Sequence, residues 1–161
     1  MIERVPISKT GHAKLREELI RLERKDRIEV VKSIEVARAH GDLKENAEYH
    51  AAKERQGHIE GRIIELKDKL GRAQVIDCTA VSTDRIVFGT VVTLVDFDSD
   101  EEVTYQLLGG EESDVKKGRI SIFSPWGKAM IGKEVGDEFE VHTPGGIRQL
   151  EVLEIAQGER P

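Results

Sequence analysis

The sequence is poor in cysteine, in aromatic residues and in long apolar runs. Its single cysteine, Cys78, excludes an internal disulfide, and the several cysteines of a zinc finger are missing. Aromatic residues make up 4% and charged residues 35%, a balance typical of long solvated helices rather than one large core. No apolar stretch approaches the roughly 20 residues of a membrane-spanning helix, and residues 1–6 lack the apolar segment of a secretory signal. We therefore expect a soluble cytoplasmic protein with no membrane partner.

The net charge of −6 is unevenly distributed along the 161 residues. Residues 1–77 carry 17 Lys and Arg against 15 Asp and Glu, whereas residues 78–161 carry 8 against 16. This asymmetry suggests two units with different partners. The acidic second half is poorly suited to binding nucleic acid through its phosphates, but it is suited to docking on a basic protein surface.

The first half contains two segments with helical periodicity. In the first, a charged stretch at 24–27 interrupts an apolar pattern of Leu15, Leu19, Leu22, Ile28, Val31 and Ile34. In the second, spacings of 7, 4, 3, 4 and 3 form a heptad seam of Ala52, Ile59, Ile63, Leu66, Leu70 and Ala73. The short link, broken at Gly41, makes the two helices antiparallel neighbours. Residues 1–77 are therefore predicted to form an antiparallel coiled-coil hairpin with its tip at residues 40–49.

The second half changes from helical to alternating periodicity. Turn residues separate short apolar or alternating runs, which predict strands within 88–95, 103–108, 120–123, 138–142 and 149–155. Ser124 and Pro125 mark the start of one short helix, as N-cap and first helical residue. Residues 78–161 are therefore predicted to form a small antiparallel β domain with one helix, and the whole chain is an α+β protein of two domains.

Two carboxylates, Asp42 and Glu45, lie in the polar turn between the predicted helices. One reading is structural, because Asp-x-x-Glu ahead of a helix resembles a capping box, with Asp42 as cap and Glu45 at the third helical position. The other reading is functional, because two acids three residues apart at a helix start can face the same way and carry charge into a narrow site. These two residues alone favour the structural reading, since caps are common at helix starts.

The longest recognisable stretch covers residues 37–54, and shorter matches follow at 60–63, 73–77, 131–133 and 143–146. These segments resemble the bacterial GreA/GreB transcript-cleavage factor family over essentially the whole chain. The resemblance implies an N-terminal antiparallel coiled coil and a C-terminal domain similar to FKBP. It also implies a factor that binds bacterial RNA polymerase, inserts its coiled coil into the secondary channel and promotes cleavage of the RNA 3′ end in backtracked complexes.

The resemblance further implies roles for individual residues. Asp42 and Glu45 would supply carboxylates to the polymerase active centre and share its Mg²⁺ only in that complex, so that the chain is an accessory factor rather than an enzyme, with no cofactor of its own. Arg38 and Lys53 would form a basic patch that contacts the RNA. Asn46 and Tyr49 would support the tip. Ser124 and Pro125 would dock on the polymerase. We expect the factor to act as a monomer.

Each role has an alternative. Lys and Arg on a coiled coil are usually solvated charges, and Tyr49 could stack on a base or pack across the hairpin. Trp126, after the docking residues, is an interface anchor if exposed and a core residue if buried. For the whole chain, the alternatives are a channel-binding homologue that inhibits polymerase without cleavage, a prolyl isomerase with a coiled-coil handle, and a plain coiled-coil adaptor.

Overall fold

The computed structural model describes residues 3–158. The chain divides into two compact units. One contains residues 12–73, and the other contains residues 4–11 together with the chain from Gln74 onward. The first strand, β1 (Val5–Ser8), therefore belongs with the C-terminal unit, where it forms a two-stranded sheet with β2 (Ala73–Ile76). No helix within the described residues is long and apolar enough to cross a membrane.

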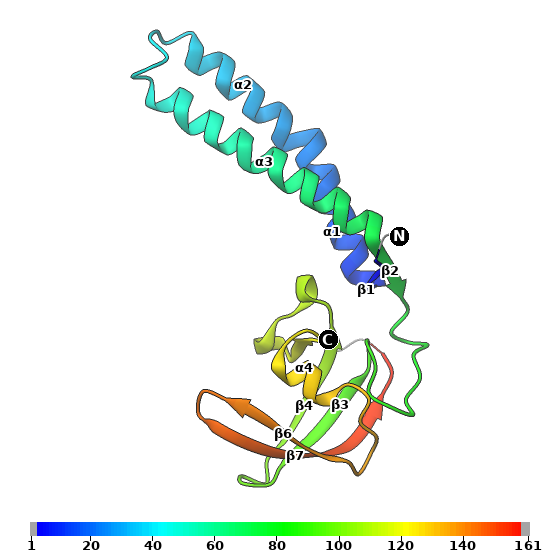
Figure 1. Ribbon diagram of the computed structural model, residues 1–161. Coiled ribbons are helices and arrows are strands. Elements are labelled where there is room, and N and C mark those ends of the chain that lie inside the picture. Colours follow the sequence, from blue (N-terminus) through cyan, green and yellow to red (C-terminus); the bar gives the residue numbers. More distant parts are fainter. Residues whose placement is uncertain (1–2, 159–161) are drawn as a thin grey trace. The chain divides into compact units, whose positions relative to one another are not determined.

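The helical unit is an antiparallel hairpin. Its first arm consists of α1 (Lys9–Arg21), a π-helical turn η1 (Leu22–Asp26) and α2 (Arg27–Arg38), and its second arm is α3 (Ala47–Arg72). Figure 1 shows α2 and α3 running side by side, with the loop of residues 39–46 joining them at one end. The 26 residues of α3 span about 39 Å at the rise of an α-helix. The predicted antiparallel coiled coil is confirmed.

The seam between the two arms differs from its predicted pattern in the first arm. Leu22 and Val30 are buried, eight residues apart, whereas Ile28 and Val31 are 50% and 41% exposed. The prediction of Ile28 and Val31 as seam residues was wrong because a regular α-helix was assumed through the charged stretch. The π-helical turn takes up one extra residue, which rotates the following helix so that Val30 and Ile34 face α3.

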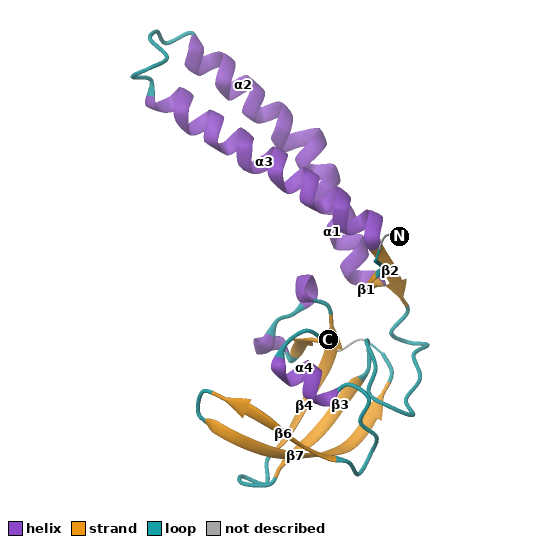
Figure 2. Ribbon diagram, viewed as in Figure 1, coloured by secondary structure: helices purple, strands orange, loops and turns teal. Residues whose placement is uncertain are grey.

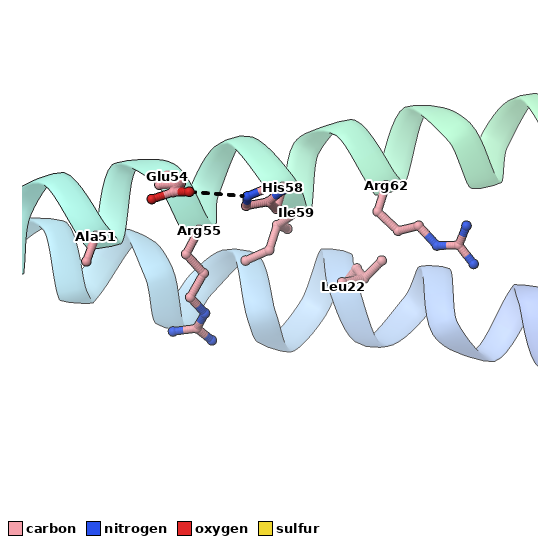
Figure 3. A pocket seen from close by; sticks show the side chains of 7 residues that line it. All are labelled: Leu22, Ala51, Glu54, Arg55, His58, Ile59 and Arg62. Carbon is pink, nitrogen blue, oxygen red and sulfur yellow. Dashed lines mark ion pairs between the residues drawn. The ribbon is translucent and has the colours of Figure 1, made fainter.

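An open groove of about 390 Å³ lies on the hairpin beside this π-helical turn. Its apolar floor includes Leu22 and Ile59, and Figure 3 shows Ile59 directed from α3 toward the opposite arm. The rim contains Arg55, whose side chain pairs with Glu29, and Arg62, whose side chain pairs with Glu18. The groove marks the place where the charged stretch adds no apolar side chain to the seam.

The C-terminal unit is built on a five-stranded sheet with the order β5-β4-β3-β7-β6. The strands are β3 (Val91–Asp96), β4 (Glu102–Leu108), β5 (Arg119–Ser121), β6 (Glu138–Thr143) and β7 (Gly146–Ala156). Three of the pairs are antiparallel, as predicted, but β4 and β5 run parallel. Two short 3₁₀ turns, η2 (Gly110–Glu112) and η3 (Val115–Lys117), carry the chain between β4 and β5, which gives it the length to return in the same direction.

A short helix, α4 (Pro125–Met130), packs with this sheet (Figure 2). Met130 is fully buried, and it shares a core with alternating residues of β3 and β7 such as Leu94 and Val152. Burying one such side chain stabilises the fold by about 1.5–3 kcal/mol. The five predicted strands and the predicted helix are all present, so the α+β fold is confirmed.

Candidate functional site

The tip of the hairpin is an irregular loop rather than a helix start. Residues 41–45 are all exposed, and α3 begins at Ala47. Its N-cap is Asn46, whose Oδ1 accepts a hydrogen bond from the backbone N–H of Tyr49 at 3.0 Å. The interpretation of Asp42 and Glu45 as a capping box is therefore wrong, because Asn46 holds the cap position and both acids precede the helix. They also do not share a helix face.

Asn46 also ties the two arms together. Its Nδ2 donates a hydrogen bond to the carbonyl oxygen of Ala37 in α2 at 2.6 Å. The amide oxygen of Asn46 thus binds the backbone of α3, and its amide nitrogen binds the backbone of α2. Asn46 therefore gives the loop a fixed end on each arm.

The two tip acids differ in their surroundings. One oxygen of Asp42, Oδ1, accepts a hydrogen bond from the backbone N–H of Lys44 at 2.9 Å, which forms an Asx turn. The Glu45 carboxylate makes no hydrogen bond or ion pair with any residue of the described range 3–158. Both side chains are exposed. Both acids therefore retain carboxylate oxygens that can bind another group. Asp42 has one oxygen without a hydrogen bond within the described residues, and Glu45 has two.

Arg38, the last residue of α2, lies with its guanidinium carbon 5.8 Å from the centre of the Tyr49 ring. This cation–π contact crosses the hairpin, so Tyr49 packs against the opposite arm, and its ring is half-buried. Lys53, on α3, donates a hydrogen bond to Gln56 at 3.1 Å and is exposed. The two basic side chains therefore stand on opposite arms next to the loop.

One residue of the tip was missed by sequence reasoning. His50 places its Nε2 atom 3.0 Å from the carbonyl oxygen of Lys44, in the middle of the loop. Its ring and the Tyr49 ring form a T-shaped pair, with the ring centres 5.6 Å apart. The spacing of the histidines along the sequence did not point to this contact. The hydrophobic periodicity of a sequence indicates which face of a helix is buried, but it does not indicate a polar contact from the helix to the preceding loop.

Asp42 and Glu45 are residues of the tip whose side chains could serve as metal ligands. Two carboxylates are the hard oxygen donors that Mg²⁺ prefers, and this ion is typically bound by one or two of them together with substrate phosphate. Across residues 3–158, no group of three or more His, Cys, Asp or Glu side chains is arranged to hold a metal.

In the C-terminal unit, Ser124 and Pro125 take the positions that their residue types predict. The Ser124 side chain accepts a hydrogen bond from the backbone N–H of Gly127 at 3.1 Å, and Pro125 is the first residue of α4. Trp126 is half-buried and meets Tyr105 edge-to-face at 5.7 Å, against the core of the sheet. Phe123, just before the cap, is 56% exposed. The exposed aromatic residue next to Ser124 and Pro125 is therefore Phe123 rather than Trp126.

Comparison with known proteins accounts for both units. Residues 5–75 match the family described as "Transcription elongation factor, N-terminal", and residues 81–157 match "Transcription elongation factor, GreA/GreB, C-term". The chain belongs to the GreA/GreB family of transcription elongation factors. Together the two GreA/GreB matches span both the helical hairpin and the five-stranded sheet.

Individual members of the GreA/GreB family are similar along their whole length. Transcription elongation factor GreA of Desulfotalea psychrophila is 67% identical over 159 residues, with 99% of each chain covered. The GreA of Rhizobium etli is 55% identical, with 98% of this chain and 100% of the relative covered. Among solved structures, the GreA factor homolog 1 (Gfh1) of Thermus thermophilus is 32% identical, with a TM-score of 0.44. The match covers 95% of this chain and 99% of the Gfh1 chain.

Proposed function

We propose that this chain binds bacterial RNA polymerase, inserts its hairpin into the secondary channel and stimulates cleavage of the RNA 3′ segment in backtracked elongation complexes. It acts as an accessory factor, because the hairpin contributes carboxylates and the polymerase contributes the active site. The observation that carries the proposal is the state of Asp42 and Glu45. Both acids are exposed at the far end of a long hairpin, and the cap and cross-arm bonds that folding requires are made by Asn46 instead.

The dimensions of the hairpin support this mode of action. A helix of about 39 Å separates the tip from the β2 end of α3, so the acids can reach a site that a compact domain cannot enter. Residues 41–45 are all exposed, and a narrow loop of this kind can enter a confined site without unfolding.

The carboxylates suit phosphodiester hydrolysis in a two-metal site, where one ion activates the attacking water and the other stabilises the leaving oxygen. Mg²⁺, when bound in the complex, supplies the charge that activates this water. Glu45, with both oxygens available, can complete its ligand shell or accept a proton from the water. Asp42 can use its remaining oxygen in the same way, while its other oxygen keeps the Asx turn closed.

The basic residues next to the tip suit the displaced RNA. Arg38 and Lys53 stand on opposite arms, so they can contact phosphates on both sides of an RNA strand that lies across the tip. Tyr49 orients the Arg38 guanidinium through their cation–π contact. In the C-terminal unit, Ser124, Pro125 and the exposed Phe123 form a surface suited to docking on the polymerase.

The proposal is tested by RNA cleavage in a stalled, backtracked bacterial elongation complex. Asp42→Asn and Glu45→Gln are expected to bind polymerase as the wild type does and to lose at least about 100-fold in stimulated cleavage. Glu45→Gln is also expected to leave the free energy of unfolding within about 0.5 kcal/mol, because a surface residue without partners contributes little. Polymerase binding by the wild type without acceleration of cleavage would contradict the proposal.

A further inference from the structure

The backbone around Lys44 is held on both sides by side chains of the tip. The Asp42 carboxylate accepts from the Lys44 N–H at 2.9 Å, and the His50 imidazole lies 3.0 Å from the Lys44 carbonyl oxygen. Within the described chain, residues 41–45 take part in no backbone–backbone hydrogen bond that would fix the loop in another way. These two contacts therefore restrain the middle of the loop.

The Lys44 carbonyl belongs to the same planar peptide unit as the nitrogen and Cα of Glu45. Fixing this oxygen fixes the orientation of the plane from which the Glu45 side chain departs. The Glu45 carboxylate has no partner within residues 3–158, so nothing beyond its own rotamers and the backbone determines its direction. The His50 contact is thus the restraint nearest to Glu45.

We propose that His50 is a positioning residue for Glu45. It holds the Lys44–Glu45 peptide so that the carboxylate is presented outward before the tip reaches its target. This inference deepens the proposed function and rests on it. Because the partner is a carbonyl oxygen, which can only accept, Nε2 must carry the proton. Both the neutral Nε2–H tautomer and the imidazolium can make this bond.

The surroundings of His50 suit a residue whose ring must keep one orientation. The His50 and Tyr49 rings form a T-shaped pair, and Arg38 lies over the Tyr49 ring from the opposite arm. The tip loop, α3 and the end of α2 are therefore joined through one chain of contacts. Because misplacing a catalytic group by about 1 Å can cost about 100-fold in rate, this restraint is expected to affect cleavage more than binding.

The test uses the full chain with two substitutions at His50 and one matched control. His50→Leu removes the donor and keeps good helix propensity, whereas His50→Gln keeps an N–H donor at a similar reach. His58→Leu makes the same change two turns further along α3, where the side chain is 78% exposed and lies 3.8 Å from Glu54. Three quantities are measured: the NMR order parameter of the Glu45 amide in the free protein, the affinity for polymerase, and the cleavage rate at saturating factor.

With His50→Leu, we expect the Glu45 order parameter to fall toward the flexible range of about 0.6 and the saturating cleavage rate to fall about tenfold, with polymerase affinity unchanged. His50→Gln should restore most of both values, and His58→Leu should change neither. An unchanged order parameter in His50→Leu would overturn the positioning role, whatever the cleavage result. A lower order parameter with a wild-type cleavage rate would overturn its functional importance. Failure of the wild type itself to accelerate cleavage would instead contradict the proposed function.

Discussion

Arg62 in α3 and Glu18 in α1 are joined by two parallel hydrogen bonds, from Nε at 2.8 Å and from Nη2 at 3.0 Å. Both side chains are largely covered, with 30% and 27% of their surface exposed. The hydrogen bonds from Arg62 lower the pKa of the Glu18 carboxyl, although burial partly opposes this shift. Bidentate pairs of this kind are stronger and more geometrically specific than single contacts, so this pair helps to set the register of α1 against α3.

Glu18→Gln is expected to lower the free energy of unfolding of the hairpin by about 1 kcal/mol at pH 7, because it removes the charge from a bidentate pair. The pKa of Glu18 is lower in the folded than in the unfolded state. Its contribution is therefore fully present above the pKa of an unfolded glutamate and is lost as the pH falls through the lowered folded pKa. Urea unfolding followed by circular dichroism at 222 nm, at pH 7 and near pH 3, measures this difference.

Glu17→Gln is the control for the Glu18 prediction, because Glu17 is exposed on the same helix. It should leave the free energy of unfolding nearly unchanged at both pH values. If the destabilisation by Glu18→Gln were equally large near pH 3, the ionised pair would not be its source, and lost packing of the side chain would explain it instead.

The π-helical turn predicts a different response to deletions at two places in the first arm. Removing Lys25 from η1 shortens the spacing from Leu22 to Val30 from eight positions to seven, which is the spacing of a heptad, so the turn can become α-helical with the seam unchanged. Removing Lys32 from α2 instead rotates the following residues by about 100°, which takes Ile34 and Ala37 out of the seam. Both lysines are exposed, so neither deletion removes a core side chain.

We expect the Lys25 deletion to keep the thermal midpoint of the hairpin near the wild-type value or above it. The Lys32 deletion should destabilise the hairpin by at least about 2 kcal/mol, from the exposure of Ile34 alone. Thermal unfolding monitored at 222 nm distinguishes the two. Equal destabilisation by both deletions would show that the π-helical turn does not set the register of the seam.

The turn also shows where sequence reasoning succeeds and where it fails. The heptads of α3 and the alternating strands were predictable because burial on one face imposes a period on the sequence. The buried position of Val30 was not, because one extra residue in a helical turn shifts the period without changing composition. The parallel pairing of β4 with β5 was missed for a related reason: alternation indicates a strand, but it does not indicate its direction.

At the tip, the residue types indicated a loop between the two helices but not which residue caps the second helix. The sequence marked Asp42 and Glu45 as unusual, and its helix start signals were interpreted with Asp42 as the cap, whereas Asn46 is the cap in the structure. The choice depends on the long-range hydrogen bond from Asn46 to Ala37, since only a residue at that point of the loop can reach both arms. The position of β1 in the C-terminal unit likewise depends on contacts between distant parts of the chain, such as the hydrogen bonds of Ser8 to Glu112.

Replacing Gly127 in α4 by alanine is expected to destabilise the protein, although the same replacement stabilises most helices. A Cβ atom at this position would lie 2.2 Å from the carbonyl oxygen of Ser121 and 2.7 Å from the Cα of Ile122. Both are backbone atoms, so the helix would have to move away from β5. Gly127→Ala is therefore expected to destabilise the C-terminal unit by about 1–3 kcal/mol, measured as a lower thermal midpoint in the fluorescence of Trp126.

Gly57→Ala is the matched control for this prediction, because a Cβ atom there meets no atom within 4 Å. In the middle of α3, replacing glycine should stabilise the hairpin by about 0.5–1 kcal/mol through helix propensity. If Gly127→Ala were stabilising as well, the close approach of α4 to the end of β5 would not be a feature of the folded protein in solution.

Two substitutions at Asn46 separate its role as a cap from its role as a link between the arms. Asn46→Asp keeps an oxygen acceptor for the Tyr49 N–H but loses the donor to the Ala37 carbonyl, whereas Asn46→Ala loses both contacts. Loss of an N-cap typically costs about 1 kcal/mol. We expect Asn46→Ala to lower the stability of the hairpin by at least this amount, and Asn46→Asp to retain the helical content at the start of α3. Because the link across the arms is absent in both, the two variants should show similarly reduced cleavage at saturating factor. Cleavage by Asn46→Asp at the wild-type rate would mean that capping alone is enough to support the tip.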